Sequence, residues 1–235
     1  MSHHACSHHS SDGHNIVGCV SRVPIFNRLP VEQMNEIRQV VQSITIDKGE
    51  IMYHAGDRSD SLYIVNKGKI KIYRLSESGK EQLVRILQPG DFTGELALFQ
   101  QRIHESYAEA MESSQICQIK SEDLQQFLLK YPTISIKILS EFANRLESAE
   151  KQTANVATEK VETRIAMCLV DCLESEQSSS NTIELPMSKK DLASYLGTTP
   201  ETLSRRLREF EKSGFIRQQG QRQIKIIDPD ALLLI

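Results

Sequence analysis

The sequence predicts an α+β protein in which a β jelly roll, a long helix and a winged helix-turn-helix follow one another. Three observations predict this class: short period-two segments separated by glycines, a long run without glycine, and two short helical patterns on either side of a glycine. We expect a flexible arm at residues 1–20, a jelly roll at 21–131, a long helix at 132–158 and a winged helix-turn-helix at 159–235.

Composition limits the class of protein. The 235 residues are 39% hydrophobic and 25% charged, which is enough to bury a core and argues against global disorder. No apolar run approaches the roughly 18–20 residues that cross a bilayer, and the polar start MSHHACSHHSSDGHN lacks the apolar stretch of a signal peptide. We therefore expect a cytoplasmic protein without membrane contact, whose five cysteines are thiols, metal ligands or redox sensors rather than structural disulfides.

The jelly-roll prediction depends on residues 44–119. Apolar and polar residues alternate there, as in SLYIVNKGKIKIYRL and EQLVRIL. Turn signals separate these segments, and the glycines at their centres are Gly49, Gly56, Gly68, Gly79, Gly90 and Gly94. Many short strands with regular turns are typical of a double-sheet barrel or jelly roll. A short helical segment within residues 21–42 is expected to pack onto it.

The long helix begins at Pro132 and carries an apolar seam. The seam residues follow 3-4-3 spacing and are Ile136, Leu139, Ala143 and Leu146. This spacing is typical of helix pairing between two chains and predicts a homodimer, whereas a core-facing stripe within one chain is the alternative. A second helix begins after a break near Thr158, and its Cys168 and Cys172 are interpreted as small buried hydrophobic residues rather than as metal ligands.

A compact module follows the loop at residues 175–181. Ser188 to Asp191 is a capping-box-like start, with Asp in place of the usual Glu or Gln, for a short helix, DLASYL, that stops at Gly197. Thr199 and Pro200 are a good N-cap and first residue for a second helix at 200–213. FIRQQGQRQIKIID then predicts a two-stranded wing around Gly220. Residues 186–235 carry nine Lys and Arg against six Asp and Glu, a net charge of +3, while the rest of the chain is at −6. The module therefore predicts a partner in double-stranded DNA.

The second helix of this module has one polar face suited to a DNA major groove. Glu201, Ser204, Arg205 and Arg208 share that face, and Leu203, Leu207 and Phe210 are expected to pack inward. Arg can grip guanine, Glu can accept from cytosine, and Ser can bond a base edge. The further expected DNA contacts, mostly to phosphates, are Ser188, Lys189, Lys190, Thr199, Arg206, Arg217 and Arg222. A solvated charged face is the alternative.

Taken together, these segments resemble the cAMP receptor protein/FNR (CRP/FNR) family of bacterial transcription regulators over nearly the full chain. KGEIMYHAGDRSDSLYIVNKGKIKIY and QPGDFTGELALF resemble its cyclic-nucleotide-binding-type jelly roll, and LASYLGTTPETLSRRLREFEKSGFI its DNA-binding module. The resemblance implies a homodimeric activator or repressor that binds a two-fold-symmetric operator and contacts RNA polymerase. Glu201, Ser204 and Arg205 match the E-x-x-S-R pattern of the FNR-like branch, which implies half-sites similar to TTGAT rather than TGTGA.

The resemblance also locates the remnant of an effector pocket. Gly94 and Glu95, followed by Leu96, match the glycine turn and the ribose-binding Glu of the cyclic-nucleotide binders. The position of their phosphate-binding Arg falls at Glu105, and that of their Ser at Ser106. Because a carboxylate repels a phosphate, cAMP is not the expected effector. Another small ligand in the jelly-roll pocket, or a role as a cyclic-nucleotide-binding regulatory module, is the alternative.

The expected signal involves cysteine. By the resemblance, Cys117 lies where the β-domain cysteine of an FNR-type iron–sulfur cluster falls, but only Cys6 and Cys19 precede it, in place of a closely spaced triplet. Together with nearby histidines, the candidate ligands of a transition metal or an iron–sulfur cluster are Cys6, Cys19, Cys117, His8, His9 and His14. A reversible disulfide between Cys117 and Cys6 or Cys19, as in FNR-like proteins of Gram-positive bacteria, is the second possibility, and no sensing role is the third.

An enzyme is not expected. Among the jelly-roll residues only His54 and His104 are histidines, and they form no H-x-H pair of the kind metal dioxygenases use. The chain also lacks a nucleophile elbow, a Walker A motif and an H-E-x-x-H motif.

Overall fold

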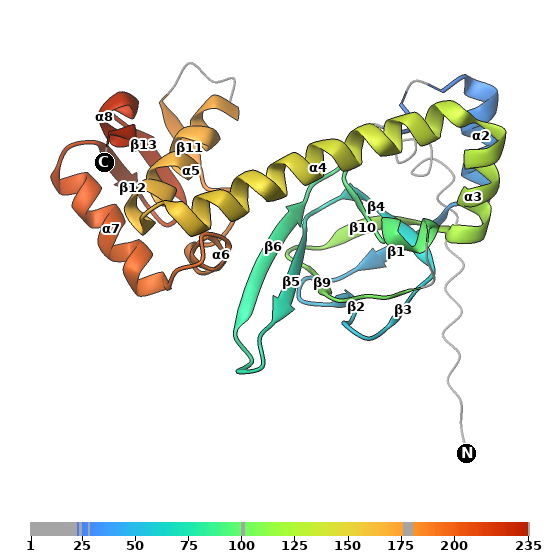
Figure 1. Ribbon diagram of the computed structural model, residues 1–235, viewed down its shortest axis with the longest axis horizontal. Helices are drawn as coiled ribbons and strands as arrows, with labels where there is room; N and C mark the ends of the chain where they lie inside the picture. The colour runs from blue at the N-terminus through green and yellow to red at the C-terminus, as the bar shows by residue number, and fades with distance from the viewer. Residues whose placement is uncertain (1–22, 24, 28, 100–101, 176–180, 235) are drawn as a thin grey trace. The chain divides into compact units, whose positions relative to one another are not determined.

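The computed structural model describes residues 23, 25–27, 29–99, 102–175 and 181–234 (Figure 1). The chain divides into two compact units. The first contains Met1–Ile72 and Ile86–Glu141, and the second contains Tyr73–Arg85 and Phe142–Ile235. Each unit has its own buried core, so the two are described separately.

Short antiparallel strands build the predicted jelly roll. They are β1 (Gln42–Ile46), β2 (Ile51–Tyr53), β3 (Arg58–Ser59), β4 (Ser61–Lys67), β5 (Ile70–Leu75), β6 (Glu81–Leu87), β7 (Phe92–Thr93), β8 (Arg102–Ile103), β9 (Tyr107–Ala110) and β10 (Ser114–Lys120). One sheet has the order β1-β10-β4-β7, a second has the order β2-β9-β5-β6, and β3 pairs with β8. The period-two pattern places alternate side chains of these strands in the core.

The core of the jelly roll takes side chains from both four-stranded sheets. A single buried cluster contains Ile46, Tyr53, Val65, Ile70, Ile72, Leu87, Ala108, Ala110 and Ile116. Burial of an aliphatic side chain of this size contributes about 1.5–3 kcal/mol, so this cluster is the main source of stability for the sheets.

Two helices flank the strands in sequence. Helix α2 (Val31–Val40) corresponds to the expected helical segment before the sheet, whereas α3 (Ser121–Lys130) has no counterpart in the sequence prediction. Leu124 and Phe127 bury one face of α3. Glu36 of α2 accepts hydrogen bonds from Lys130 Nζ at 2.6 Å and from the Tyr131 hydroxyl at 2.9 Å. These contacts lower the pKa of Glu36 and tie the two helices together.

The long helix α4 extends over Pro132–Thr158, and α5 (Val161–Ser175) begins after a two-residue break (Figure 1). Ile134 and Ile138 are the buried side chains of α4. The predicted seam faces solvent in the single chain, because Ile136, Leu139 and Leu146 are each more than 60% exposed. The seam is therefore not the core-facing stripe of a single chain.

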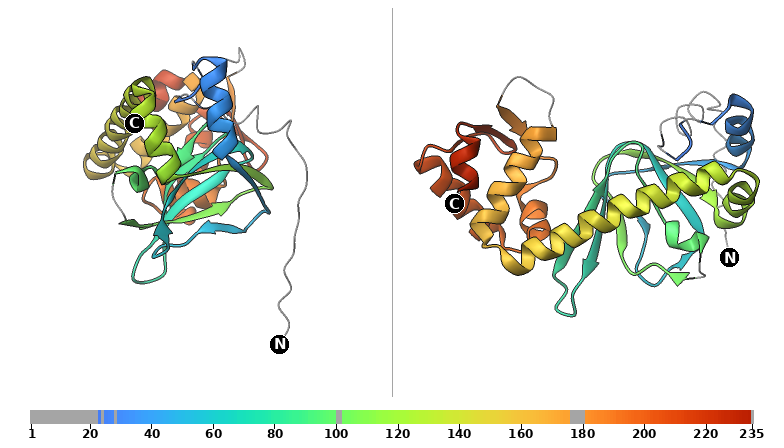
Figure 2. Two further views of the ribbon diagram at one scale, coloured as in Figure 1. Left: turned by 90° about the vertical axis from the view of Figure 1, so that its right-hand side faces the viewer. Right: turned by 45° about the horizontal axis from the view of Figure 1, so that its top comes forward.

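The remaining elements of the second unit form the predicted winged helix-turn-helix. They are β11 (Thr182–Glu184), α6 (Lys189–Tyr195), α7 (Pro200–Lys212), β12 (Ile216–Gln219), β13 (Gln223–Ile226) and α8 (Pro229–Leu233). The wing is wider than predicted, because β11 pairs with β13 in a sheet of order β11-β13-β12. The C-terminal helix α8, also absent from the prediction, lies against α5 (Figure 2).

The helices that the structure describes include none with both the length and the apolarity required to cross a membrane.

Candidate DNA-binding surface and effector site

Local chemistry fixes where α7 begins. The Thr199 hydroxyl accepts a hydrogen bond from the Thr202 backbone N–H at 3.2 Å, and Pro200 occupies the first turn. This is the N-cap that the sequence predicts, and it satisfies one of the backbone donors left unpaired at a helix start. Leu203, Leu207 and Phe210 are buried, as expected from their spacing. The cap thus fixes where α7 begins, and the buried apolar residues fix which of its faces is turned to the core.

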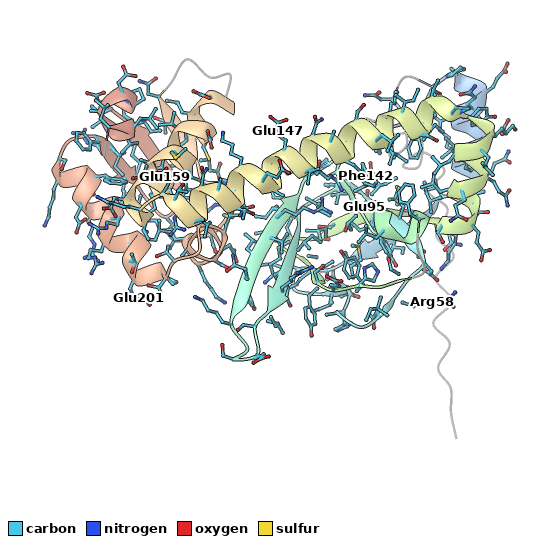
Figure 3. All side chains as sticks on the ribbon, viewed as in Figure 1. Arg58, Glu95, Phe142, Glu147, Glu159 and Glu201 are labelled. Carbon is cyan, nitrogen blue, oxygen red and sulfur yellow. The ribbon has the colours of Figure 1, made fainter. Side chains whose placement is uncertain are left out.

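With its apolar face buried, α7 presents a polar face to solvent. Glu201, labelled at the start of the helix in Figure 3, is exposed, as are Arg205 and Arg208, and Ser204 is half-buried. Arg208 Nε donates to the Ser204 backbone carbonyl at 3.2 Å, which holds the guanidinium along the helix. The four predicted base-contacting residues therefore lie together on one side of one rigid element.

Helix α6 is capped in the same way. The Ser188 hydroxyl accepts from the Asp191 backbone N–H at 3.1 Å and donates to the Asp191 carboxylate at 2.6 Å. The chain then turns at Gly197, whose φ of +65° is in the left-handed region where glycine is favoured. Ser188 is thus the N-cap of α6, and Asp191 accepts from its hydroxyl rather than from its backbone N–H, as a full capping box would require. After the turn at Gly197, α7 packs against α6.

Two of the basic residues expected at phosphates make hydrogen bonds that involve the wing. Lys189 Nζ donates to Gln218 Oε1 at 2.8 Å, and Arg222 donates to the Leu185 carbonyl from Nε at 3.1 Å and from its terminal nitrogen at 2.7 Å. Lys190 and Arg217 are exposed. The wing thus carries cations at the same end of the module as the start of α6.

Arg206 differs from these residues because two carboxylates of the same unit hold it. Its guanidinium lies 2.7 Å from Glu209 and 3.4 Å from Glu162 on α5. The hydrogen bond to Glu209 and the charge of Glu162 raise its pKa. A phosphate contact by Arg206 would have to compete with both carboxylates.

One residue at the recognition module escaped the sequence prediction. Glu211, near the end of α7, accepts from the Gln218 backbone N–H at 2.8 Å and from the Gln218 side-chain amide at 3.1 Å. Both bonds lower the pKa of Glu211 and connect α7 to β12. No sequence spacing indicates this pair, because it depends on how the wing folds back onto the helix.

The candidate effector turn lies between β7 and the short helix η1 (Glu95–Leu98). Gly94 adopts a φ of +82°, and a Cβ added to it would overlap the Ser61 carbonyl oxygen. Glu95, labelled beside η1 in Figure 3, is half-buried, and Leu96 is exposed. Glu105 is exposed and Ser106 is half-buried. The structure therefore gives the left-handed glycine turn that the sequence predicts, followed by Glu95 at the start of η1.

An aromatic cluster lies behind this turn. The buried imidazole of His104 stacks on the Tyr53 ring with centroids 3.7 Å apart, and the Tyr53 hydroxyl is hydrogen-bonded to the Thr93 hydroxyl at 2.9 Å. Burial lowers the pKa of His104, and the charges of Asp57, Asp60 and Glu95 offset this effect only in part. His104 is therefore neutral at physiological pH and supplies no cation to replace the missing arginine.

Two family models match this arrangement. The model described as "Cyclic nucleotide-binding domain" matches residues 43–131, and the model described as "Crp-like helix-turn-helix domain" matches residues 163–235. The chain belongs to the CRP/FNR family of transcription regulators. The combination of jelly roll, long helix and winged helix-turn-helix is the architecture of this family, so the predicted fold class is confirmed.

Relatives of this CRP/FNR regulator cover most of both chains. The chain is 33% identical over 212 residues to a probable transcriptional regulator, flp, of Lacticaseibacillus casei, which covers 90% of this chain and 95% of the relative. It is 30% identical to the anaerobic regulatory protein of Haemophilus influenzae, over 91% of this chain and 84% of the relative. The solved structure of FixK2 from Bradyrhizobium japonicum has a TM-score of 0.71 and 26% identity, and covers 82% and 96%. The two curated relatives are named as regulators, and the family implies DNA binding and dimerisation.

The described cysteines of this CRP/FNR regulator fall into two kinds. Cys117, on β10, is 1% exposed and is disulfide-bonded. Cys168 and Cys172, on α5, are free thiols. The other residues predicted to bind a metal or to take part in redox sensing lie outside the described residues: Cys6, Cys19, His8, His9 and His14. Within the described ranges no group of three or more His, Cys, Asp and Glu side chains could hold a metal ion.

Proposed function

We propose that this CRP/FNR regulator reads a two-fold-symmetric operator with α7, one copy of the helix in each half-site. The observation that carries the proposal is that Glu201, Arg205 and Arg208 are exposed on one face while Leu203, Leu207 and Phe210 bury the other. A helix anchored in this way can enter a major groove without losing its own packing. DNA binding is then set by two rigid helices and their separation.

The residues on α7 indicate which bases are read. Arg205 can bond the O6 and N7 atoms of a guanine, Glu201 can accept from a cytosine amino group, and Ser204 can bond a neighbouring base edge. With the E-x-x-S-R pattern, this set favours an FNR-like half-site similar to TTGAT. Lys190 and Arg217 are assigned to phosphates, which position the protein without specifying sequence.

Two alanine variants test the assignment of these roles. Arg205→Ala is expected to cost about 1–3 kcal/mol on an FNR-like palindrome and to relax the preference at one base position. Arg217→Ala is the matched control, since it removes the same charge; it should weaken binding to all sequences alike and reduce the dependence on salt. Gel shifts at several salt concentrations measure both effects. Wild-type affinity in Arg205→Ala, or selection of TGTGA half-sites by the wild type, would contradict the assignment.

The signal is proposed to be the thiol state of Cys117. Oxidation joins Cys117 to Cys6 or Cys19, releasing two electrons and two protons to an oxidant, and reduction returns both thiols. The disulfide-bonded state of Cys117 supports this exchange. Because Cys168 and Cys172 are free, Cys6 and Cys19 are the cysteines left as partners for Cys117 within one chain. While Cys117 is bonded to sulfur it offers no thiolate to a metal or an iron–sulfur cluster, so no step is assigned to such a group.

We expect cAMP not to control this protein. Glu105 faces solvent where the family pattern places the phosphate-binding arginine, and the buried His104 is neutral. Repulsion between the Glu105 carboxylate and the cyclic phosphate opposes binding. Isothermal titration with cAMP should give no heat of binding for the wild type. Binding in the micromolar range would reverse this conclusion and return the effector to the jelly-roll pocket.

The signal is proposed to act through the packing of α4. A change near the jelly roll alters how the two α4 helices pair in the dimer, and that pairing sets the distance and angle between the two α7 helices. The bound dimer then contacts RNA polymerase to activate or repress transcription. The apolar, exposed seam of α4 supports this route, because it gives the two chains a face on which to pair.

A further inference from the structure

Cys168 and Cys172 form a thiol pair on a helix that the proposed regulation does not use. They stand four residues apart on α5, both are free, and both are only half-buried. A hydrogen bond with the Cys172 side chain, followed by burial, raises the pKa of Cys168, so the pair is held as protonated thiols. The sequence favoured two small buried hydrophobic residues at these positions, but each thiol keeps partial access to solvent and has the other as its neighbour.

The spacing of this pair suits a bridging atom better than a disulfide. Side chains at i and i+4 of a helix have Cβ atoms about 5–6 Å apart. A disulfide requires Cβ atoms only about 3.5–4.5 Å apart, so oxidation would deform α5. Two metal–sulfur bonds of about 2.3 Å each span up to about 4.6 Å between the sulfurs. The undistorted helix therefore presents its two thiols at the separation of two ligands to one centre.

The surroundings limit what that centre can be. No third His, Cys, Asp or Glu completes a metal-binding group in the described part of the chain, so a tetrahedral zinc site is not matched. Centres that accept two sulfurs and few other ligands remain, and soft thiolates select soft partners. Tyr195 of α6 lies close enough to both thiols for their charges to raise the pKa of its phenol, after the larger effect of burial. The pair thus lies where α5 faces the first helix of the recognition module.

We propose that Cys168 and Cys172 are a dithiol site for a soft centre of low coordination number, such as Cu(I) or a trivalent arsenical. With an arsenical carrying one organic group and one oxide, two As–S bonds form and two S–H bonds break. The two protons leave with the oxide as water. Arsenic stays trivalent, so the step needs no oxidant or reductant. The site is independent of the operator and of Cys117.

Phenylarsine oxide tests the site in the full, reduced chain. After one equivalent is bound, the protein is unfolded, its remaining thiols are alkylated, and it is cut with trypsin. Cleavage after Arg164 and Lys189 leaves both cysteines in the peptide 165–189. Both should escape alkylation in the wild type, which requires no variant. Full alkylation of that peptide, with the arsenical elsewhere or unbound, would overturn the proposal.

Single substitutions separate a dithiol from two independent thiols. Cys168→Ser and Cys172→Ser should each weaken arsenical binding by roughly 10²-fold or more, because the second bond becomes unavailable. Cys19→Ser is the matched control and should leave occupancy of the peptide unchanged. Circular dichroism establishes that each variant is folded, and unchanged affinity in either folded α5 variant counts against the site. Titration of Cu(I) against a competing chelator then distinguishes a metal ion from a metalloid. If both variants lose Cu(I) affinity, the site also binds the ion. If both variants retain Cu(I) affinity, the site is restricted to arsenicals.

Discussion

At the scale of single residues, Gly94 of the candidate effector turn is required to be glycine for two separate reasons. Its φ of +82° is one reason for glycine, and the Ser61 carbonyl oxygen, which a Cβ would overlap, is a second. Gly49 shares only the first reason, since its φ is +84° and no atom lies within 4 Å of an added Cβ. Comparing substitutions at these two positions of the first unit therefore distinguishes the cost of backbone strain from the cost of steric overlap.

Alanine substitutions at these two glycines should differ in cost. Gly49→Ala is expected to lower the free energy of unfolding by about 1–2 kcal/mol, the penalty for a left-handed residue with a side chain. Gly94→Ala should cost clearly more, because β4 must also move away from the new methyl group. Urea unfolding of both variants measures the difference. Equal costs would show that the approach of Gly94 to Ser61 is not tight.

Residues with local causes were predictable from sequence. The caps at Ser188 and Thr199 depend on a hydroxyl and the next turn of the same helix, and both are present. The contacts of Arg206 with Glu162 and of Glu211 with Gln218 were not predicted, because each joins segments that only the fold brings together. Sequence therefore located the face of α7 more reliably than it located the partners of individual charges.

At the scale of elements, strong periodicity made the strands and the long helices predictable, and short elements were missed. Helix α3 has ten residues and directly follows β10, so the sequence pattern did not separate it from the strand region. Strand β11 has three residues, and α8 has five. Each is only about one and a half repeats of its pattern long, which is too short to show periodicity. Contacts with β13 stabilise β11, and contacts with α5 stabilise α8.

The seam of α4 gives a test at the same scale. Leu146 is 61% exposed on the seam, and Leu129 is 85% exposed on α3, away from it. Leu146→Glu should convert the dimer to monomer by placing two like charges in the pairing face, with little effect on the stability of the single chain. Leu129→Glu is the matched control and should remain dimeric. Sedimentation velocity distinguishes the two, and a dimeric Leu146→Glu variant would argue against pairing through α4.

At the scale of the whole molecule, the proposed account requires one chemical event in the jelly roll to change DNA binding by the second unit. Cys117 is buried on β10, where it pairs with Ser43 of β1 and Ile64 of β4, so a bond at its sulfur acts on the centre of a sheet. Coupling between sites of this kind typically changes affinity about 5–150-fold. Family membership accounts for the DNA-binding end of this path, whereas the signal at Cys117 and its coupling to DNA binding are the central claim.

The most direct test measures the affinity for an FNR-like palindrome with the protein reduced by dithiothreitol and oxidised by diamide. The wild type is expected to change its affinity by about tenfold or more between the two conditions, and Cys117→Ser is expected to show one affinity in both. Cys168→Ser serves as the matched control and should respond as the wild type does. A wild-type affinity that ignores the thiol state, or a Cys117→Ser variant that still responds to it, would contradict the account.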